Sequence, residues 1–375
     1  MKKCILIPDS FKGTLSAMEF CRLGRDAILR HFPESQVLCI PVADGGEGTV
    51  DCFAEALGAR RICVPSTGPW GETVIARYAR HGDTAFVEMA QNAGLPMVGD
   101  HKDPSLTTTF GVGQVIRAAV EAGCEHVVLG LGGSCTNDAG TGAACALGVR
   151  FFDASGNAFI PNGSTLHKIA AYDTHEAEKL LQNCRITAMC DIDNPMYGPQ
   201  GAAAIFAPQK GADAAMVAQL DAGLHSLGEL IRRQSGRDVA HLPGAGAAGA
   251  FGAGVAAFLG GELRSGIETV LDCVNFDSLL ADTDMVFTGE GCIDSQSLRG
   301  KVVIGVAKRA KAHHVPVTVI VGAVGEGAEA AYECGVSSIF SINRRAEDFT
   351  VSQYKTHENF SATMDSIVRL MAAAR

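Results

Sequence analysis

Apolar and polar residues alternate along the start of the chain in a pattern that predicts strand, helix, strand and helix. Short apolar runs at Cys4–Ile7 and Val37–Val42 are typical of buried strands. Between them, Ala17–His31 has helical spacing, with Ser16 in position to cap it and a glutamate three residues later. A second helix is predicted over Gly48–Leu57. This order favours parallel strands.

The same alternation of strands and helices is predicted near the end of the chain. Predicted strands and helices alternate there over Met285–Thr288, Lys301–Ala312, Val317–Val321, Glu326–Cys334, Ser338–Ile342 and Asn359–Ala373. Five parallel strands from the two chain ends predict a flavodoxin-like sheet of order 2-1-3-4-5. In that order, ligands bind beyond the carboxyl ends of the first and third strands.

The pattern between these ends is different. Short apolar runs at Arg61–Val64, Thr73–Arg80 and Thr84–Met89 are separated by tight Gly and Pro turns, which favours antiparallel pairing. We therefore predict an α/β protein of two domains. A discontinuous Rossmann- or flavodoxin-like parallel-sheet domain covers 1–64 plus 284–375, and an inserted mixed-sheet α/β domain covers 65–283.

The composition limits the classes of binding partner and the cellular compartment that we expect for this protein. The net charge of −10 disfavours nucleic acid and anionic membrane surfaces. No apolar stretch is long enough to span a membrane, and the first apolar run is too short for a signal peptide. The 13 cysteines include no CxxC pair, which favours reduced thiols in a cytoplasmic protein. A homo-oligomer stays possible, because the sequence does not determine the oligomeric state.

A glycine-rich stretch, Val127–Gly142, supplies the first candidate site. An apolar run leads into glycines and hydroxyl, amide and carboxylate side chains, and an Ala-rich helical segment follows. Backbone N–H groups at such a turn, together with the helix start, can bind a phosphate or carboxylate. A capped turn without a ligand is equally consistent. The candidate residues are Gly132, Gly133, Ser134, Thr136, Asn137 and Asp138.

Two further turns follow the first two predicted strands. The turn Pro8–Thr14 carries Asp9, Ser10 and Lys12, and its lysine can meet an anion or simply be solvated. The turn Ala43–Thr49 offers backbone donors and a carboxylate that can face a metal, although ordinary turn and helix-start roles explain the same residues. Its candidate residues are Asp44, Gly45 and Gly46.

Carboxylates also follow two strands in the second half of the chain. A turn predicted over Thr288–Asp294 contains Gly289, Glu290 and Gly291, and Glu290 or Asp294 can hold Mg²⁺. Lys301 near a helix start can face the same charge or be an ordinary helix lysine. Asp191, directly after the strand Arg185–Cys190, is the candidate base, with Asp294 as its rival for that role. Lys210 is predicted in a loop. The stretch Thr107–Gly113 is hydroxyl-rich just before a predicted helix, and helix capping alone is enough to explain it.

Nine segments together resemble the bacterial glycerate kinases. In order along the chain they are PDSFKGTLSA, PVADGGEGT, STGPWGE, EMAQNAGL, LGLGGSCTNDAGTG, CDIDNPMYGPQGA, FAPQKGA, PGAGAAGAFG and TGEGCIDSQSLRGK. The sequence departs from the family pattern at Trp70, Cys135, Ala139 and Cys292. The last departure removes a phosphate-facing basic residue and leaves Lys12, Lys210 and Lys301 to supply that charge.

The resemblance implies phosphorylation of D-glycerate by ATP with Mg²⁺, with 2-phospho-D-glycerate as the product, in organic-acid catabolism. It also implies that the substrates bind between the two domains. Asp191, Lys12 and Lys301 are the expected catalytic residues. The alternative is an NAD(P)-dependent oxidoreductase of a small hydroxy acid, which also uses glycine turns, although no GxGxxG motif follows the first strand.

Overall fold

A computed structural model describes residues 1–11, 13–43, 45–295, 297–299 and 301–374. By contact, the chain forms two compact units. Unit 1 contains Met1–Asp44, Glu55–Gly58 and Ser265–Arg375, and unit 2 contains Gly45–Ala54 and Ala59–Arg264. The domain boundaries expected near residues 64 and 284 stay a prediction, since these units divide the chain at different residues.

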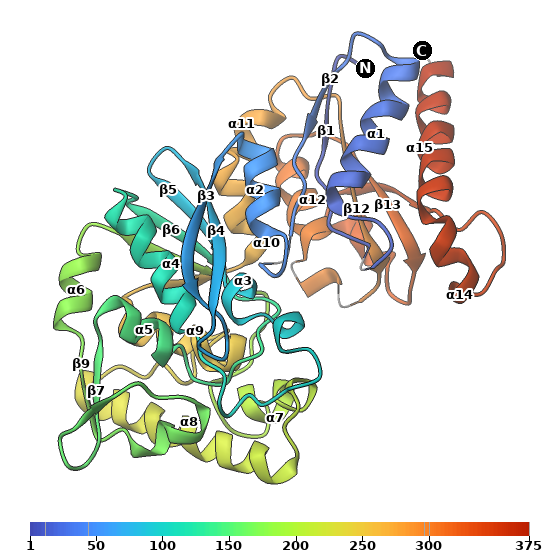
Figure 1. Ribbon diagram of the computed structural model, residues 1–375. Helices are drawn as coiled ribbons and strands as arrows, with labels where there is room; N and C mark the ends of the chain where they lie inside the picture. Colours follow the sequence, from blue (N-terminus) through green and yellow to red (C-terminus); the bar gives the residue numbers. More distant parts are fainter. Residues whose placement is uncertain (12, 44, 296, 300, 375) are drawn as a thin grey trace. The chain divides into compact units, whose positions relative to one another are not determined.

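Unit 1 is built on a five-stranded parallel sheet of order β14-β13-β12-β1-β2 (Figure 1). The strands are β1 (Lys3–Leu6), β2 (Gln36–Cys39), β12 (Met285–Ile293), β13 (Val317–Val324) and β14 (Val336–Ser341). Numbered by rank along the chain, this is the order 2-1-3-4-5, so the predicted flavodoxin-like sheet from the two chain ends is confirmed.

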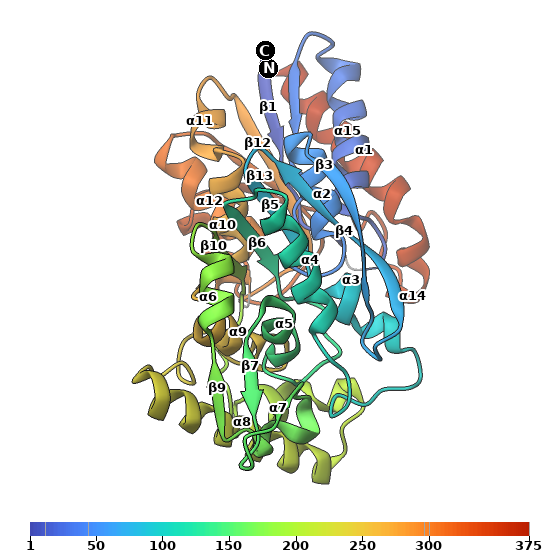
Figure 2. The same ribbon diagram turned by 60° about the vertical axis from the view of Figure 1, so that its left-hand side comes forward.

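Two long helices pack together beside this sheet. Helix α1 (Ala17–His31) begins at the predicted cap, where Ser16 and Glu19 form the capping box. Its Phe20 ring packs on Phe360 of α15 (Thr356–Ala373), and both views show the two helices side by side (Figures 1 and 2). The other helices of unit 1 are α10 (Gly266–Cys273), α11 (Phe276–Leu280), η4 (Ser297–Arg299), α12 (Val302–Ala312), α13 (Ala330–Glu333), α14 (Phe349–Ser352) and η5 (Gln353–Lys355).

The turn predicted over Thr288–Asp294 is wrong, because β12 continues as a strand to Ile293. Pairing with β13 runs from Val286 through Ile293, so ladder hydrogen bonds outweigh the local turn preference of the glycines. Gly289 is needed there for space, since a Cβ atom would lie 2.1 Å from the Ile320 carbonyl oxygen. The glycines therefore allow close strand packing.

Unit 2 is built on a six-stranded mixed sheet of order β11-β10-β6-β5-β4-β3. Its strands are β3 (Arg60–Thr67), β4 (Thr73–His81), β5 (Thr84–Glu88), β6 (His126–Gly130), β10 (Arg185–Met189) and β11 (Glu262–Arg264). The β3–β4–β5 pairs are antiparallel, as predicted, and β5, β6, β10 and β11 run parallel. The mixed-sheet α/β architecture is confirmed.

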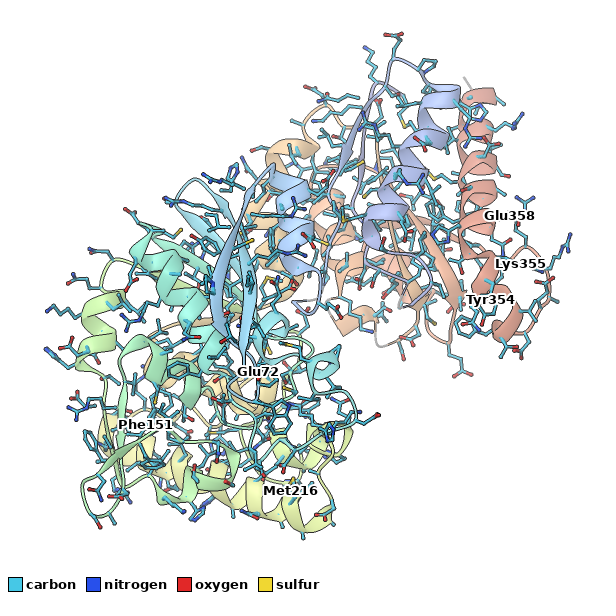
Figure 3. All side chains as sticks on the ribbon, in the orientation of Figure 1. Glu72, Phe151, Met216, Tyr354, Lys355 and Glu358 are labelled. Carbon is cyan, nitrogen blue, oxygen red and sulfur yellow. The ribbon has the colours of Figure 1, made fainter. Side chains whose placement is uncertain are left out.

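Helices and a small sheet complete unit 2. The three-stranded sheet has the order β8-β7-β9, and buried Phe151 of β7, labelled in Figure 3, meets the Phe258 ring edge-on. The remaining elements are α2 (Thr49–Leu57, which begins in unit 2), α3 (Ala90–Ala93), η1 (Leu95–Val98), α4 (Phe110–Glu121), α5 (Thr141–Leu147), β7 (Arg150–Phe152), β8 (Ala158–Phe159), η2 (Gly163–Lys168), β9 (Ala171–Asp173), α6 (His175–Leu181), α7 (Ala202–Phe206), η3 (Pro208–Lys210), α8 (Ala214–Ser235) and α9 (Ala247–Phe258). Among the described residues, no helix is long and apolar enough to cross a membrane.

Candidate functional site

The glycine-rich loop of unit 2 leaves the carboxyl end of β6. The Gly132 N–H donates to the Gly45 carbonyl at 2.9 Å, and a Cβ atom on Gly132 would lie 2.6 Å from the Gly46 nitrogen. The two predicted glycine turns therefore touch through their backbones. Farther along, Leu95 N–H donates to the Gly133 carbonyl at 2.8 Å, which fixes the opposite side of the loop.

Asp138 occupies the position where the sequence analysis expected helix N–H groups to meet an anion. Its buried carboxylate accepts hydrogen bonds from the Thr109 N–H and hydroxyl at 2.9 and 2.8 Å, and from the Gly140 and Gly142 N–H groups at 3.1 and 3.3 Å. Burial raises the pKa of Asp138, and these bonds act in the opposite direction. The start of α5 is thus capped by this carboxylate, which corrects the helix part of the expected anion cradle.

Lys210 is buried beneath the same loop. It ends the short helix η3 and donates from Nζ to the Ser134 hydroxyl at 2.7 Å and to the Thr136 carbonyl at 2.8 Å. Burial lowers the pKa of Lys210 to about 8. Instead of lying in an open loop, as predicted, this ammonium group holds two loop residues in place.

Thr136 and Asn137 carry the polar atoms that the loop leaves unused. Both side chains are fully buried, and the Thr136 hydroxyl and both polar atoms of the Asn137 amide have no hydrogen-bond partner. Leaving such atoms unpaired costs about 1–3 kcal/mol per group. The fold keeps these buried donors and acceptors unpaired despite this cost. They are therefore suited to bind a polar ligand.

A left-handed turn at the start of α9 supports these two residues. Ala248, Gly249 and Ala250 all have positive φ, at 55°, 65° and 68°. A Cβ atom on Gly249 would lie 2.1 Å from the Thr136 carbonyl oxygen, so only glycine permits this approach. The Gly249 carbonyl accepts the Ala139 N–H at 3.0 Å. Ala139 itself has φ 53°, which accounts for the family preference for glycine there.

Asp191 lies just beyond the carboxyl end of β10, which pairs directly with β6. Its side chain is exposed, and the preceding Cys190 is fixed by an N–H bond to the Arg264 carbonyl at 2.9 Å. Cys190 also approaches the glycine segment before α9, since its sulfur would lie 2.7 Å from a Cβ on Gly244. An accessible carboxylate at a fixed strand end is suited to act as a base.

Two polar residues of this region, Glu88 and Thr109, were not predicted from the sequence as part of the site. Glu88 ends β5 and accepts the Val50 N–H at 2.9 Å at the start of α2, while burial raises the pKa of this carboxyl group. A carboxylate that ends an apolar strand was the available signal. Thr109 was assigned to capping alone, yet it makes no side-chain cap bond and its hydroxyl binds Asp138.

In unit 1, predicted site residues gather at the carboxyl ends of β1 and β12. Asp9 N–H donates to the Gly289 carbonyl at 2.9 Å, and Ser10 N–H donates to the Asp9 carboxylate at 2.6 Å. Glu290 is 6% exposed, and its Oε1 atom has no hydrogen-bond partner. Burial raises the pKa of Glu290 to about 7, and the charges of Asp9 and Asp294 act in the same direction.

Asp294 and Lys301 follow β12 with different surroundings. The Asp294 carboxylate accepts the Ser297 N–H at 3.2 Å, as in an Asx-type turn. Lys301 is the exposed N-cap residue of α12. Its positive charge acts to lower the pKa of Glu290, against the larger effect of burial. Gly291 lies in the β12 strand. Lys12 and Asp44 lie outside the described residues.

The carboxylates of unit 1 fit Mg²⁺ when it is bound together with a phosphate ligand. No group of three or more His, Cys, Asp or Glu side chains within the described part of the chain forms a metal site. Mg²⁺ at a nucleotide, however, needs only one or two carboxylates, because water and phosphate oxygens complete its octahedron. The unpartnered Oε1 of Glu290 is an available oxygen of this kind.

Comparison with known proteins decides the family. The model of the glycerate kinase family matches residues 4–372. The chain belongs to the glycerate kinase family. It is therefore a kinase, and the predicted resemblance and enzyme class are confirmed.

Individual relatives of this glycerate kinase family member cover nearly all of it. A glycerate kinase of Bacillus cereus is 42% identical over 99% of this chain and 98% of its own length. A glycerate 2-kinase of Escherichia coli is 42% identical over 91% of this chain and 90% of its own length. The crystal structure of a putative glycerate kinase 2 from Salmonella typhimurium LT2 is 41% identical, with a TM-score of 0.86 over 100% of this chain and 98% of that one. The oxidoreductase alternative gains no support.

Proposed function

We propose that this enzyme transfers the γ-phosphoryl group of ATP to the 2-hydroxyl of D-glycerate, producing 2-phospho-D-glycerate and ADP. The observation that carries the proposal is the loop after β6, where the buried Thr136 hydroxyl and Asn137 amide keep hydrogen-bonding capacity for a ligand. Glycerate offers a carboxylate and two hydroxyl groups, and ATP offers phosphate oxygens, so either substrate can use these atoms. The name glycerate 2-kinase of the Escherichia coli relative supports the choice of hydroxyl.

Asp191 is proposed as the general base. Its carboxylate accepts the proton of the attacking hydroxyl while the oxygen–phosphorus bond forms and the bond to the bridging oxygen of ADP breaks. Glu290 and Asp294 are proposed to hold Mg²⁺, which neutralises phosphate charge when bound. Lys301 and Ser10 are proposed to bind phosphate in unit 1, and Asp9 is proposed to bind a hydroxyl group of the substrate. The thirteen cysteines, all held as thiols, fit a cytoplasmic enzyme of organic-acid phosphorylation.

The test is turnover of purified protein with D-glycerate and ATP, followed by phosphorus NMR of the product. We expect ADP and the 2-phosphate ester, whose phosphorus couples to a single carbon-bound proton. Asp191→Asn is expected to lower kcat by about 10²–10⁴ while leaving ATP binding nearly unchanged. Asp193→Asn, another exposed aspartate of the same loop, is the matched control. Formation of the 3-phosphate ester, or wild-type turnover in Asp191→Asn, contradicts the proposal.

A further inference from the structure

A surface groove of unit 1 carries two thiols from different elements. Its volume is about 560 Å³, and it is lined by residues of α1 and by the end of β2. Cys21 and Cys39 both face it, together with the charged side chains of Arg25 and Glu55. None of these residues belongs to the machinery proposed for phosphoryl transfer.

The fold brings Cys21 and Cys39 to the same groove from different elements. Cys39 is the last residue of β2 and pairs with Leu6 of β1. Cys21 lies on the buried side of α1, and its sulfur contacts the Leu6 carbonyl at 3.7 Å. The Cys39 thiol donates to the Cys21 carbonyl oxygen at 3.8 Å, and the Cys21 side chain lies close enough to lower the pKa of Cys39. The helix and the edge strand therefore present a pair of adjacent thiols.

Cys39 is the more accessible member of the pair. The hydrogen bond from Cys21 lowers the pKa of the Cys39 thiol, and the nearby Arg25 charge acts in the same direction, against burial and Glu55. Cys39 is half-buried, whereas Cys21 is buried. Cys4, on the neighbouring strand β1, is fully buried, and burial raises its pKa to about 12. A thiolate with access to solvent is the form that reacts with oxidants.

We propose that Cys39 and Cys21 form a peroxide-reactive dithiol site that closes to a disulfide. The Cys39 thiolate attacks one oxygen of hydrogen peroxide, so that an S–O bond forms, the O–O bond breaks and the released hydroxide takes up a proton to become water. The Cys21 sulfur then attacks the sulfenic sulfur of Cys39. The S–S bond forms, the S–O bond breaks, and a second water leaves with the Cys21 proton. One peroxide is reduced and two thiols are oxidised.

The experiment treats the full-length protein with a molar excess of hydrogen peroxide, alkylates the remaining thiols and maps the peptides by mass spectrometry. We expect a peptide pair joined through Cys21 and Cys39, the loss of two of the 13 thiols, and recovery of both with dithiothreitol. In Cys21→Ser, the Cys39 sulfenic acid is expected to persist and to be trapped by dimedone. Cys63→Ser, which changes an exposed thiol of unit 2, should leave the linkage unchanged.

Wild-type mapping keeps the proposal testable even where a variant folds poorly. The proposal is overturned if Cys39 is recovered fully alkylated while exposed Cys63 and Cys292 are oxidised. It is also overturned if Cys39 is found linked to Cys4 instead of Cys21. None of these outcomes depends on the phosphoryl-transfer reaction, so failure of this proposal and failure of the proposed function are distinguishable.

Discussion

Two buried carboxylates, one in each unit, have opposite surroundings. Burial raises the pKa of both Asp138 in unit 2 and Glu290 in unit 1. Asp138 accepts four hydrogen bonds from its own loop and from Thr109, whereas Glu290 interacts with the Ser297 side chain, which lowers its pKa, and its Oε1 has no partner. Burial alone therefore does not identify a functional acid. The number of donors that the fold supplies separates a structural carboxylate from one suited to bind a ligand.

The same distinction applies within the glycine-rich loop of unit 2. Lys210 is charged and buried, but both of its described contacts go to the loop itself. Asn137 is neutral and buried, and its amide has no partner. We infer that Asp138 and Lys210 shape the loop, and we propose that Asn137 and Thr136 bind the substrate.

Asp138→Asn should give the largest effect. The amide NH₂ group replaces an acceptor oxygen and leaves buried donors without a partner, so we expect the free energy of unfolding to fall by about 1–3 kcal/mol for each unpaired donor. Chemical denaturation measures this. Asp153→Asn is the matched control, because Asp153 accepts similar bonds from Ser155 and Asn157 on an exposed hairpin. A loss no greater than in the control would make Asp138 a ligand-facing group instead.

Glu290→Gln should have the opposite effect on stability. Native Glu290 keeps its proton up to about pH 7, whereas an unfolded glutamate releases its proton near the ordinary pKa of 4.5. The native state therefore binds more protons in this window, and wild-type stability falls as pH rises through it. Glutamine carries no titratable proton, so the stability of the variant does not fall in this way. At pH 8 the variant should be more stable than wild type by about 3 kcal/mol, with little difference at pH 4.

Kinase activity of Glu290→Gln should fall and its Mg²⁺ requirement should rise, since a carboxylate is lost. Glu358→Gln is the control, because Glu358 is exposed on α15 (Figure 3) and should change stability only slightly. Denaturation at both pH values and a magnesium titration of the rate measure these effects. A variant that is less stable at pH 8 yet fully active would show that Glu290 is structural.

The lowered pKa of Lys210 predicts that activity and stability change in opposite directions as the pH rises. Above about pH 8 the ammonium group loses its proton, its hydrogen bonds to Ser134 and Thr136 weaken, and turnover should fall several-fold. Between that pH and the ordinary lysine pKa of 10.5, the unfolded state binds more protons than the native state, so the contribution of Lys210 to stability rises with pH.

The measurement is a pH–rate profile beside a denaturation series. Lys210→Met should lower turnover and remove this descending limb. Lys355→Met is the control, because it removes an ion pair to Glu347 near the surface of unit 1 (Figure 3). If the rate of Lys210→Met still fell above the same pH, another group would be responsible for the fall.

The sequence predicted those parts of the fold that depend on local pattern. The helix Ala17–His31 and its capping box were correct because spacing and cap residues act within a few positions. The turn after Thr288 was wrong because pairing with β13, a contact distant in sequence, overrides the glycine preference. The order of the parallel strands was predicted from the alternation of strands and helices at the two chain ends.

The chemistry of the candidate site was only partly predictable. The loop from Gly132 to Asp138 was found through its residue types, but the division of roles depends on burial and on partners from other elements. Thr109 and Lys210, each distant in sequence, determine which loop atoms are already paired. No pattern along the chain contains that information, so Asp138 and Asn137 looked equivalent.

The central claim is that unpaired buried atoms of the loop await a substrate, and Asn137→Leu tests it most directly. Leucine matches asparagine in size without its polar atoms. Without ligand, we expect stability to be unchanged or higher by about 1 kcal/mol. The increase in melting temperature that D-glycerate or an ATP analogue gives the wild type should be lost for the substrate that Asn137 contacts. In Asn92→Leu, the control, stability should fall, because the Asn92 amide donates to Ser66 at 2.8 Å. An Asn137→Leu protein that is several kcal/mol less stable without ligand, and keeps both wild-type shifts, would contradict the account.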